Sequence, residues 1–202
     1  MIVIVDAGMG NVGSIANMIK RSGHQAEVSA NPEVIGKASR LILPGVGAFD
    51  AGVHALRSHN LWDVLDRRVR EGIPLLGICL GMHLLTEGSE EGVEKGFGWI
   101  SGRAVRISPV AEKKIPHMGW SEIQKLRPSP LFDETDPSPR FYFVHSFHVV
   151  CDREEDIVAT VPYGEEVTAV LHRDHIFGTQ FHPEKSHRFG VAVFKRFIEF
   201  KA

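Results

Sequence analysis

The most informative segment of the sequence is Ile73-Pro74-Leu75-Leu76-Gly77-Ile78-Cys79-Leu80-Gly81-Met82-His83-Leu84-Leu85. It begins as a short apolar run typical of a buried strand, turns at residues 77–81, and continues as a segment compatible with a helix. Glycines two residues before and two residues after Cys79 allow a reversal so tight that side chains at those positions would collide. This pattern predicts a strand–turn–helix elbow with a nucleophilic cysteine at its tip.

Cys79 would lie at the first turn of a helix, among free backbone N–H groups at the positive end of the helix dipole. This position favours the thiolate form of a cysteine. A buried, unreactive cysteine in a glycine-flanked turn is the other interpretation, because cysteine is common in protein cores. The second cysteine, Cys151, carries no motif and is interpreted as structural.

The composition is ordinary for a globular protein. The 202 residues are 43% hydrophobic and 24% charged, which is enough apolar material for one full core. A net charge of -2 gives no reason to expect nucleic acid or an anionic membrane as a partner. The two cysteines are too few for a disulfide scaffold, and residues 1–5 are too short an apolar run for a signal peptide. We therefore expect a cytoplasmic protein.

The segments before the elbow alternate between strands and helices. Apolar runs predict buried strands at residues 2–5, 26–28 and 40–43, and helical spacing predicts helices over residues 12–22, from Pro32, around 51–56 and over 62–69. This alternation predicts the α/β class, with a largely parallel central sheet flanked by helices in a flavodoxin-like, three-layer arrangement. Ligands of such sheets bind beyond the carboxyl ends of the strands, where glycine turns follow at residues 8–10, 45–47 and 77–81.

The second half adds strands and closes with a helix. Strands are predicted at residues 103–107, 119–126, 140–150, 157–161, 167–172 and 175–181, and a helix over 186–200. This half should extend the sheet with antiparallel strands, with a tight hairpin at Arg173-Asp174. There is no internal repeat or linker, so residues 1–202 are predicted to form a single domain.

His182-Pro183-Glu184 follows the last predicted strand. A thiol nucleophile needs a base that takes its proton, and the base needs a carboxylate that fixes its orientation. Cys79, His182 and Glu184 supply these three roles from strand ends at one edge of the sheet. A core or surface histidine and a helix-terminal charge are the alternatives for His182 and Glu184.

Gly77-Ile78-Cys79-Leu80-Gly81 together with His182-Pro183-Glu184 resembles the class I (triad) glutamine amidotransferase family. Three further blocks resemble the glutaminase subunits of imidazole glycerol phosphate synthase: Pro116-His117-Met118-Gly119-Trp120, Tyr142-Phe143-Val144-His145-Ser146 and Phe181-His182-Pro183-Glu184-Lys185-Ser186. The resemblance covers essentially the whole chain.

The resemblance implies hydrolysis of glutamine to glutamate and ammonia. Cys79 would attack the carboxamide, His182 would protonate the departing ammonia, Glu184 would orient His182, and water would hydrolyse the thioester. The oxyanion would be met by the backbone N–H of Leu80 and by one from the turn after residue 44. The oxyanion and substrate residues implied are Gly45, Val46, Gly47, Leu80, His83, His145 and Ser146. No cofactor and no metal are implied.

The resemblance also implies a partner. Glutaminases of this type are nearly idle alone and form a heterodimer with a cyclase subunit, a (β/α)8 barrel of the HisF type, which activates them and receives the ammonia for histidine biosynthesis. The positions that match the subunit contact or its vicinity are Met9, His117, Met118, Trp120 and Lys185. Core packing is the alternative interpretation of Met118 and Trp120.

Two departures from the family pattern affect the expected partner and substrate. His83 stands where the family usually has a glutamine that helps to hold the substrate, and Ala7 stands where it usually has tyrosine. With His187-Arg188-Phe189-Gly190, these changes resemble paralogous copies that donate ammonia to a surface-polysaccharide sugar amidotransferase. A paralogous partner is therefore an alternative prediction.

Three further alternatives stay open from the sequence. A related hydrolase with a cysteine elbow would act without a partner, and it would not need the residue 116–120 block. A catalytically weakened binding subunit would keep the fold, and its partner's function would not depend on Cys79. A metal site near His145 and His148 is the third, but no set with ligand spacing appears in the sequence.

Overall fold

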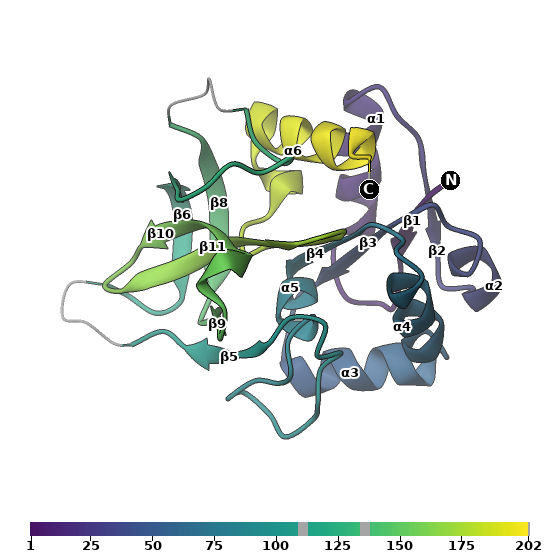
Figure 1. Ribbon diagram of the computed structural model, residues 1–202, viewed down its shortest axis with the longest axis horizontal. Coiled ribbons are helices and arrows are strands. Elements are labelled where there is room, and N and C mark those ends of the chain that lie inside the picture. The colour runs from purple at the N-terminus through teal and green to yellow at the C-terminus, as the bar shows by residue number, and fades with distance from the viewer. Residues whose placement is uncertain (109–112, 134–137, 202) are drawn as a thin grey trace.

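A computed structural model describes residues 1–108, 113–133 and 138–201 (Figure 1). Within those residues the central sheet has eight strands, in the order β2-β1-β3-β4-β12-β11-β10-β7. Their bounds are β1 Ile2–Val5, β2 Ala26–Ser29, β3 Arg40–Gly45, β4 Leu75–Cys79, β7 Gln124–Lys125, β10 Ile157–Pro162, β11 Glu166–Arg173 and β12 Ile176–Thr179. Pairing is parallel from β2 through β12 and antiparallel from β12 to β7.

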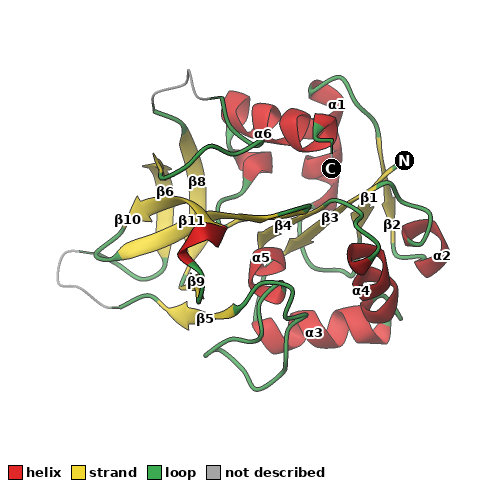
Figure 2. Ribbon diagram, in the orientation of Figure 1, coloured by secondary structure: helices red, strands yellow, loops and turns green. Residues whose placement is uncertain are grey.

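Helices cover both faces of this sheet (Figure 2). α1 (Val12–Arg21) and α6 (His187–Glu199) pack on one face, and α3 (Phe49–Ser58) and α4 (Trp62–Arg70) lie on the other, with α2 (Pro32–Ile35) beside α4 and α5 (Leu80–Leu84) after β4. Buried apolar side chains form one core cluster on each face. The predicted α/β three-layer class, with antiparallel strands added in the second half, is confirmed.

Two of the strands predicted from the sequence are each divided into two strands in the structure. Residues 140–150 form β8 (Arg140–His145) and β9 (Phe147–Cys151), and residues 119–126 form parts of β6 (His117–Glu122) and β7. β6 pairs with β8, and β9 pairs with β5 (Gly102–Arg106), so each half of the run joins a different ribbon. The alternation of buried residues breaks at Ser146, where the chain changes partner. A continuous β-prone run does not reveal such a change, because pairing partners are distant in sequence.

The order of the strands positions the site. β4 lies between β3 and β12, and all three run parallel, with Gly45 paired to Cys79 and Thr179 paired to Ile78. Their carboxyl ends therefore lie side by side at one edge of the sheet, where ligands of α/β sheets bind. Among the described residues, none of the helices has the length and apolar character needed to span a membrane.

Candidate active site

Cys79 occupies a strained turn between β4 and α5. Its φ of 55° and ψ of -111° lie in a region that non-glycine residues avoid, at a typical cost of about 1–3 kcal/mol. A Cβ built on Gly77 would lie 2.6 Å from the backbone oxygen of Gly81, which no real contact allows. Glycine at position 77 is thus required for the reversal that presents the sulfur.

The second glycine of the elbow is required for a different reason. A Cβ on Gly81 would lie 1.9 Å from the carbonyl oxygen of Leu43, on the neighbouring strand β3. A Cβ on Gly45 would lie 2.9 Å from the Cβ of Leu80. The sequence-based expectation that side chains at positions 77 and 81 would collide with each other is therefore wrong. At each position a side chain would instead collide with backbone atoms, and glycine at position 81 allows α5 to begin directly against the end of β3.

His182 and Glu184 form a buried ion pair beyond the end of β12. Nδ1 of His182 lies 2.7 Å from Oε1 of Glu184, and both side chains are nearly inaccessible. Ser186 holds this turn in place, because its hydroxyl donates to the carbonyl of His182 at 2.6 Å and accepts from the backbone N–H of Tyr142 at 3.0 Å. The backbone N–H of His182 also donates to the carbonyl of Tyr142 at 2.9 Å.

The charge around His182 favours its protonated form. Burial alone lowers the pKa of His182, but interactions with the Cys79 thiol and the Glu184 carboxylate outweigh it and raise the pKa to about 9. Among the described residues Nε2 of His182 makes no hydrogen bond of regular geometry, but the Cys79 sulfur lies close enough to interact with His182 through both hydrogen bonding and charge. The arrangement holds an imidazolium next to a buried thiol, the pair that a nucleophilic cysteine requires.

A pocket of about 480 Å³ opens directly beside Cys79. It gathers the end of β3, the elbow and the β8–β9 junction, and its lining is Val46, Gly47, Ala48, Cys79, Leu80, His83, Glu91, Pro116, Val144, His145, Ser146 and Phe147. Of the oxyanion and substrate residues predicted from the sequence, Val46, Gly47, Leu80, His83, His145 and Ser146 line this pocket. Gly45 does not line it and instead packs beneath it, against Leu80.

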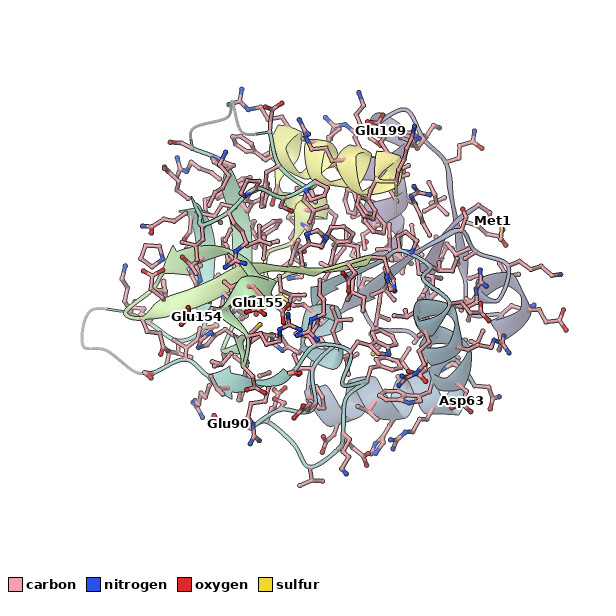
Figure 3. The ribbon with its side chains drawn as sticks, viewed as in Figure 1. Met1, Asp63, Glu90, Glu154, Glu155 and Glu199 are labelled. Atoms are coloured by element: carbon pink, nitrogen blue, oxygen red, sulfur yellow. The ribbon has the colours of Figure 1, made fainter. Side chains whose placement is uncertain are left out.

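Two residues of this region, Glu91 and Gln180, carry no motif that singles them out in the sequence. Glu91 lines the pocket and accepts a hydrogen bond from the backbone N–H of Phe49 at 2.9 Å, at the start of α3. Its neighbour Glu90 lies at the edge of the molecule (Figure 3). Gln180 is fully buried and contacts both Cys79 and His83. The signal for Gln180 was a polar residue two positions before His182, on the same face of an extended segment.

A chain of neutral histidines lies behind the pocket. Nδ1 of His145 donates to the carbonyl oxygen of Phe147 at 2.8 Å. Because a neutral ring carries one proton, Nε2 of His145 must accept, and it does so from Nδ1 of His117 at 3.1 Å. Nε2 of His117 in turn accepts from the Ser121 hydroxyl at 2.9 Å. Burial lowers the pKa of His145 well below its ordinary value and that of His117 to about 4. These histidines therefore fix the pocket wall as a hydrogen-bonded network without charge.

The predicted partner-contact residues fall into two groups. Met118 and Lys185 are exposed and Trp120 is 39% exposed, whereas Met9 and His117 are buried within the chain. The Trp120 ring stacks on the ring of His187, with centroids 5.2 Å apart and planes 2° apart. Met118, Trp120 and Lys185 are thus available to another molecule, whereas Met9 and His117 are covered by other parts of this chain.

The remaining candidates carry no site chemistry. No group of three or more metal-binding side chains occurs in the described ranges 1–108, 113–133 and 138–201. Burial raises the pKa of the Cys151 thiol to about 12, so this cysteine stays protonated and unreactive. His145 and His148 lie on different strands, β8 and β9.

Comparison with known proteins gives the same family at several levels. Residues 3–200 match the family model "Glutamine amidotransferase class-I". The chain is 49% identical to imidazole glycerol phosphate synthase subunit HisH 2 of Methanococcus maripaludis, over 98% of this chain and 99% of that protein. It is 46% identical to the subunit of the same name in Pseudomonas aeruginosa, over the same shares. The solved structure of a glutamine amidotransferase has a TM-score of 0.72 at 20% identity, over 95% of this chain and 98% of that one, which shows the shared fold.

Proposed function

Because this chain belongs to the class I glutamine amidotransferase family, and within it to the HisH subunits, we propose that it is the glutaminase subunit of an imidazole glycerol phosphate synthase. The observation that carries this proposal is the strained Cys79 elbow beside the His182–Glu184 pair and above a pocket large enough for an amino acid. We assign the nucleophile to Cys79, the acid and base to His182, and the orienting carboxylate to Glu184.

Glutamine binding is supported by the polarity of the pocket. Glu91 is exposed at the pocket and supplies a carboxylate for the α-ammonium group of the substrate. Ser146 supplies a further polar group at the pocket, whereas both ring nitrogens of His145 are already hydrogen-bonded, so His145 shapes the wall beside it. The carboxamide of the substrate would then lie at the elbow, within reach of the sulfur.

The reaction follows from the protonation state of the pair. The Cys79 thiolate attacks the carboxamide carbon and forms a tetrahedral adduct. Proton transfer from Nε2 of His182 to the amide nitrogen then breaks the C–N bond and releases ammonia. Neutral His182 next takes a proton from water, whose oxygen attacks the thioester carbon, and the C–S bond breaks to give glutamate and the thiolate. Glu184 keeps Nδ1 protonated throughout, so Nε2 remains the atom that exchanges the proton.

The oxyanion of both adducts needs N–H donors at the elbow. The N–H of Leu80 begins α5, so it has no carbonyl of the preceding turn to bind. The Val46–Gly47 peptide follows β3 on the same side of the pocket, and Gly47 has a φ of 106° that glycine adopts without strain. Each such donor is typically worth about 3–4 kcal/mol of transition-state stabilisation, so its orientation can control the rate.

The partner we propose is a cyclase subunit of the HisF type, a (β/α)8 barrel that would form a heterodimer with this chain in the cytoplasm and receive its ammonia. Three exposed residues lie near the His182–Glu184 turn. Lys185 follows it directly in sequence, and Met118 and Trp120 lie on β6, which pairs with β8 beside the turn. A partner bound to these residues would therefore be positioned to influence the site. Lys185 directly follows Glu184, and its ammonium group lies 5.5 Å from the centre of the Tyr142 ring.

The test is glutamate release from glutamine by the purified chain, alone and mixed with the histidine-pathway cyclase of the same organism plus its nucleotide ligand. We expect low release alone and at least ~100-fold stimulation in the mixture, because a misplaced oxyanion donor typically costs about 10²–10³ in rate. Absence of stimulation by this cyclase would contradict the proposed partner and favour the paralogous role with a surface-polysaccharide sugar amidotransferase.

A further inference from the structure

Gln180 lies between Cys79 and His83 in the buried centre of the site. Its side-chain Nε2 lies 3.9 Å from the Cys79 sulfur, and its Oε1 lies 2.8 Å from Nε2 of His83. Gln180 and His83 are buried, with exposed fractions of 0% and 5%. These contacts join three elements that end at the site: β4 through Cys79, α5 through His83 and the segment after β12 through Gln180.

The neutral ring of His83 and the orientation of the Gln180 amide together define the direction of both hydrogen bonds. Burial lowers the pKa of His83 to about 4, despite the bond with Gln180, so the ring is neutral at physiological pH. An amide oxygen only accepts hydrogen bonds, so Nε2 of His83 must carry the ring proton and donate it to Oε1. The amide group of Gln180 then faces the sulfur with its N–H donors. The reversed amide would place a carbonyl oxygen against the sulfur, where it would repel a thiolate.

The backbone holds Gln180 as firmly as the side-chain contacts do. Its N–H donates to the carbonyl of Ala169 on β11 at 2.9 Å, which continues the β11–β12 pairing past the end of β12. Two residues later, His182 is anchored to β8. One short extended segment therefore carries two different groups toward the sulfur: an imidazolium that can give up a proton and an amide that cannot.

We propose that Gln180 is a positioning residue for Cys79 and that His83 acts through it, by locking the amide with its N–H donors toward the sulfur. This inference rests on the proposed role of Cys79 as nucleophile. A donor that does not transfer its proton stabilises the thiolate before attack and again when sulfur leaves the thioester. It leaves His182 as the only proton donor to ammonia among the described groups around the sulfur. His83, whose Nε2 is engaged by Gln180, thus serves the nucleophile rather than primarily the substrate.

Two measurements on the full chain, assembled with its partner, test this inference. The first is kcat and KM for glutamate release from pH 5 to 10. The second is the rate of Cys79 alkylation by iodoacetamide over the same range, followed on the Cys79 peptide by mass spectrometry. Cys151 serves as an internal reference, since its thiol stays protonated.

Gln180→Leu removes the donor to sulfur, whereas Gln180→Glu keeps the shape but directs a carboxyl group at it. A hydrogen bond to a charged group is worth about 1.5–3 kcal/mol, so we expect kcat to fall roughly 10- to 100-fold in Gln180→Leu and further in Gln180→Glu. KM should change by less than ~3-fold, and the alkylation midpoint should move to higher pH by about one to two units.

His83→Leu should change the same quantities in the same direction, and His83→Gln should restore them, because glutamine can donate to Oε1 of Gln180. Thr160→Val is the matched control, since Thr160 is a buried polar residue on β10 away from the site, and it should leave both profiles unchanged.

An alkylation profile of Gln180→Leu or Gln180→Glu that coincides with that of the parent chain, in a folded variant, would overturn the inference. So would a rise in KM with unchanged kcat in His83→Leu, which would assign His83 to substrate binding. The variant Cys79→Ser distinguishes failure of the proposed nucleophile from failure of the positioning role of Gln180. If Cys79→Ser still releases glutamate, the proposed nucleophile is wrong. If it is inactive while Gln180→Leu retains full kcat, only the positioning role fails.

Discussion

We expect His182 to set the pH range in which the site is active. Its pKa is raised to about 9, because the interactions with Cys79 and Glu184 outweigh burial, so it is protonated at neutral pH and loses that proton as pH rises through 9. Because we propose that His182 protonates the departing ammonia, we expect kcat for glutamate release to fall about 10-fold per pH unit above pH 9. A pH–rate profile of the assembled enzyme measures this alkaline limb, the fall of kcat above pH 9.

Glu184→Gln tests the origin of that limb. The variant removes the negative charge beside Nδ1 of His182, so the pKa of His182 should fall and the alkaline limb should move to lower pH. We also expect kcat to fall at least ~100-fold, because an amide does not enforce the required tautomer. Glu90→Gln, on the exposed edge of the molecule, is the control. An alkaline limb at an unchanged pH in Glu184→Gln would refute the charge-based explanation.

At the scale of elements, the packing of α6 against the His182–Glu184 turn is decisive. A Cβ on Gly190 would lie 1.8 Å from the carbonyl oxygen of Pro183, so the helix approaches the turn as closely as glycine permits. Gly190→Ala should displace this turn, lower the free energy of unfolding by about 1–3 kcal/mol and reduce kcat by more than ~10-fold. Steady-state kinetics and chemical denaturation of the same preparation provide both numbers.

Ala192→Gly is the matched control for that variant. Ala192 is exposed on the same helix, and glycine there should cost about 1 kcal/mol of stability without loss of kcat. If both variants lost activity in proportion to stability, the specific contact between α6 and Pro183 would have no role in the site.

The elements and site residues that could be predicted from the sequence are those whose conformation is determined by neighbouring residues in the chain. The elbow around Cys79 and the pair His182 and Glu184 are short strings whose geometry follows from glycine, strand ends and a proline. The division of residues 140–150 at Ser146 was not predictable in this way, because β6 and β5 supply the pairing partners from elsewhere in the chain. Gln180 was missed for the same reason, since its partners Cys79 and His83 lie about a hundred residues away.

At the scale of the whole molecule, the exposed aromatic surface beside the site is expected to bind the partner. Trp120 stacks on His187 and is 39% exposed, and Met118 beside it is 61% exposed. Because buried tryptophans dominate many interfaces, Trp120→Ala should raise the Kd for the cyclase roughly 30-fold or more, while the free energy of unfolding changes by less than ~1 kcal/mol. Calorimetric titration and denaturation measure the two effects.

Val93→Ala is the control for that surface, because Val93 is 92% exposed on a different loop and should bind the partner normally. Unfolding of Trp120→Ala, or a Kd equal to that of the parent chain, would support core packing as the role of Trp120 instead.

We propose that Cys79 generates the ammonia that the partner consumes. The most direct test compares the parent chain with Cys79→Ala, each assembled with the cyclase, and measures synthesis from glutamine and from added ammonia in parallel. We expect Cys79→Ala to abolish glutamine-dependent synthesis and glutamate release, while ammonia-dependent synthesis continues at the parent rate. Glutamate release that persists in Cys79→Ala, or loss of both syntheses in an assembled complex, would contradict it.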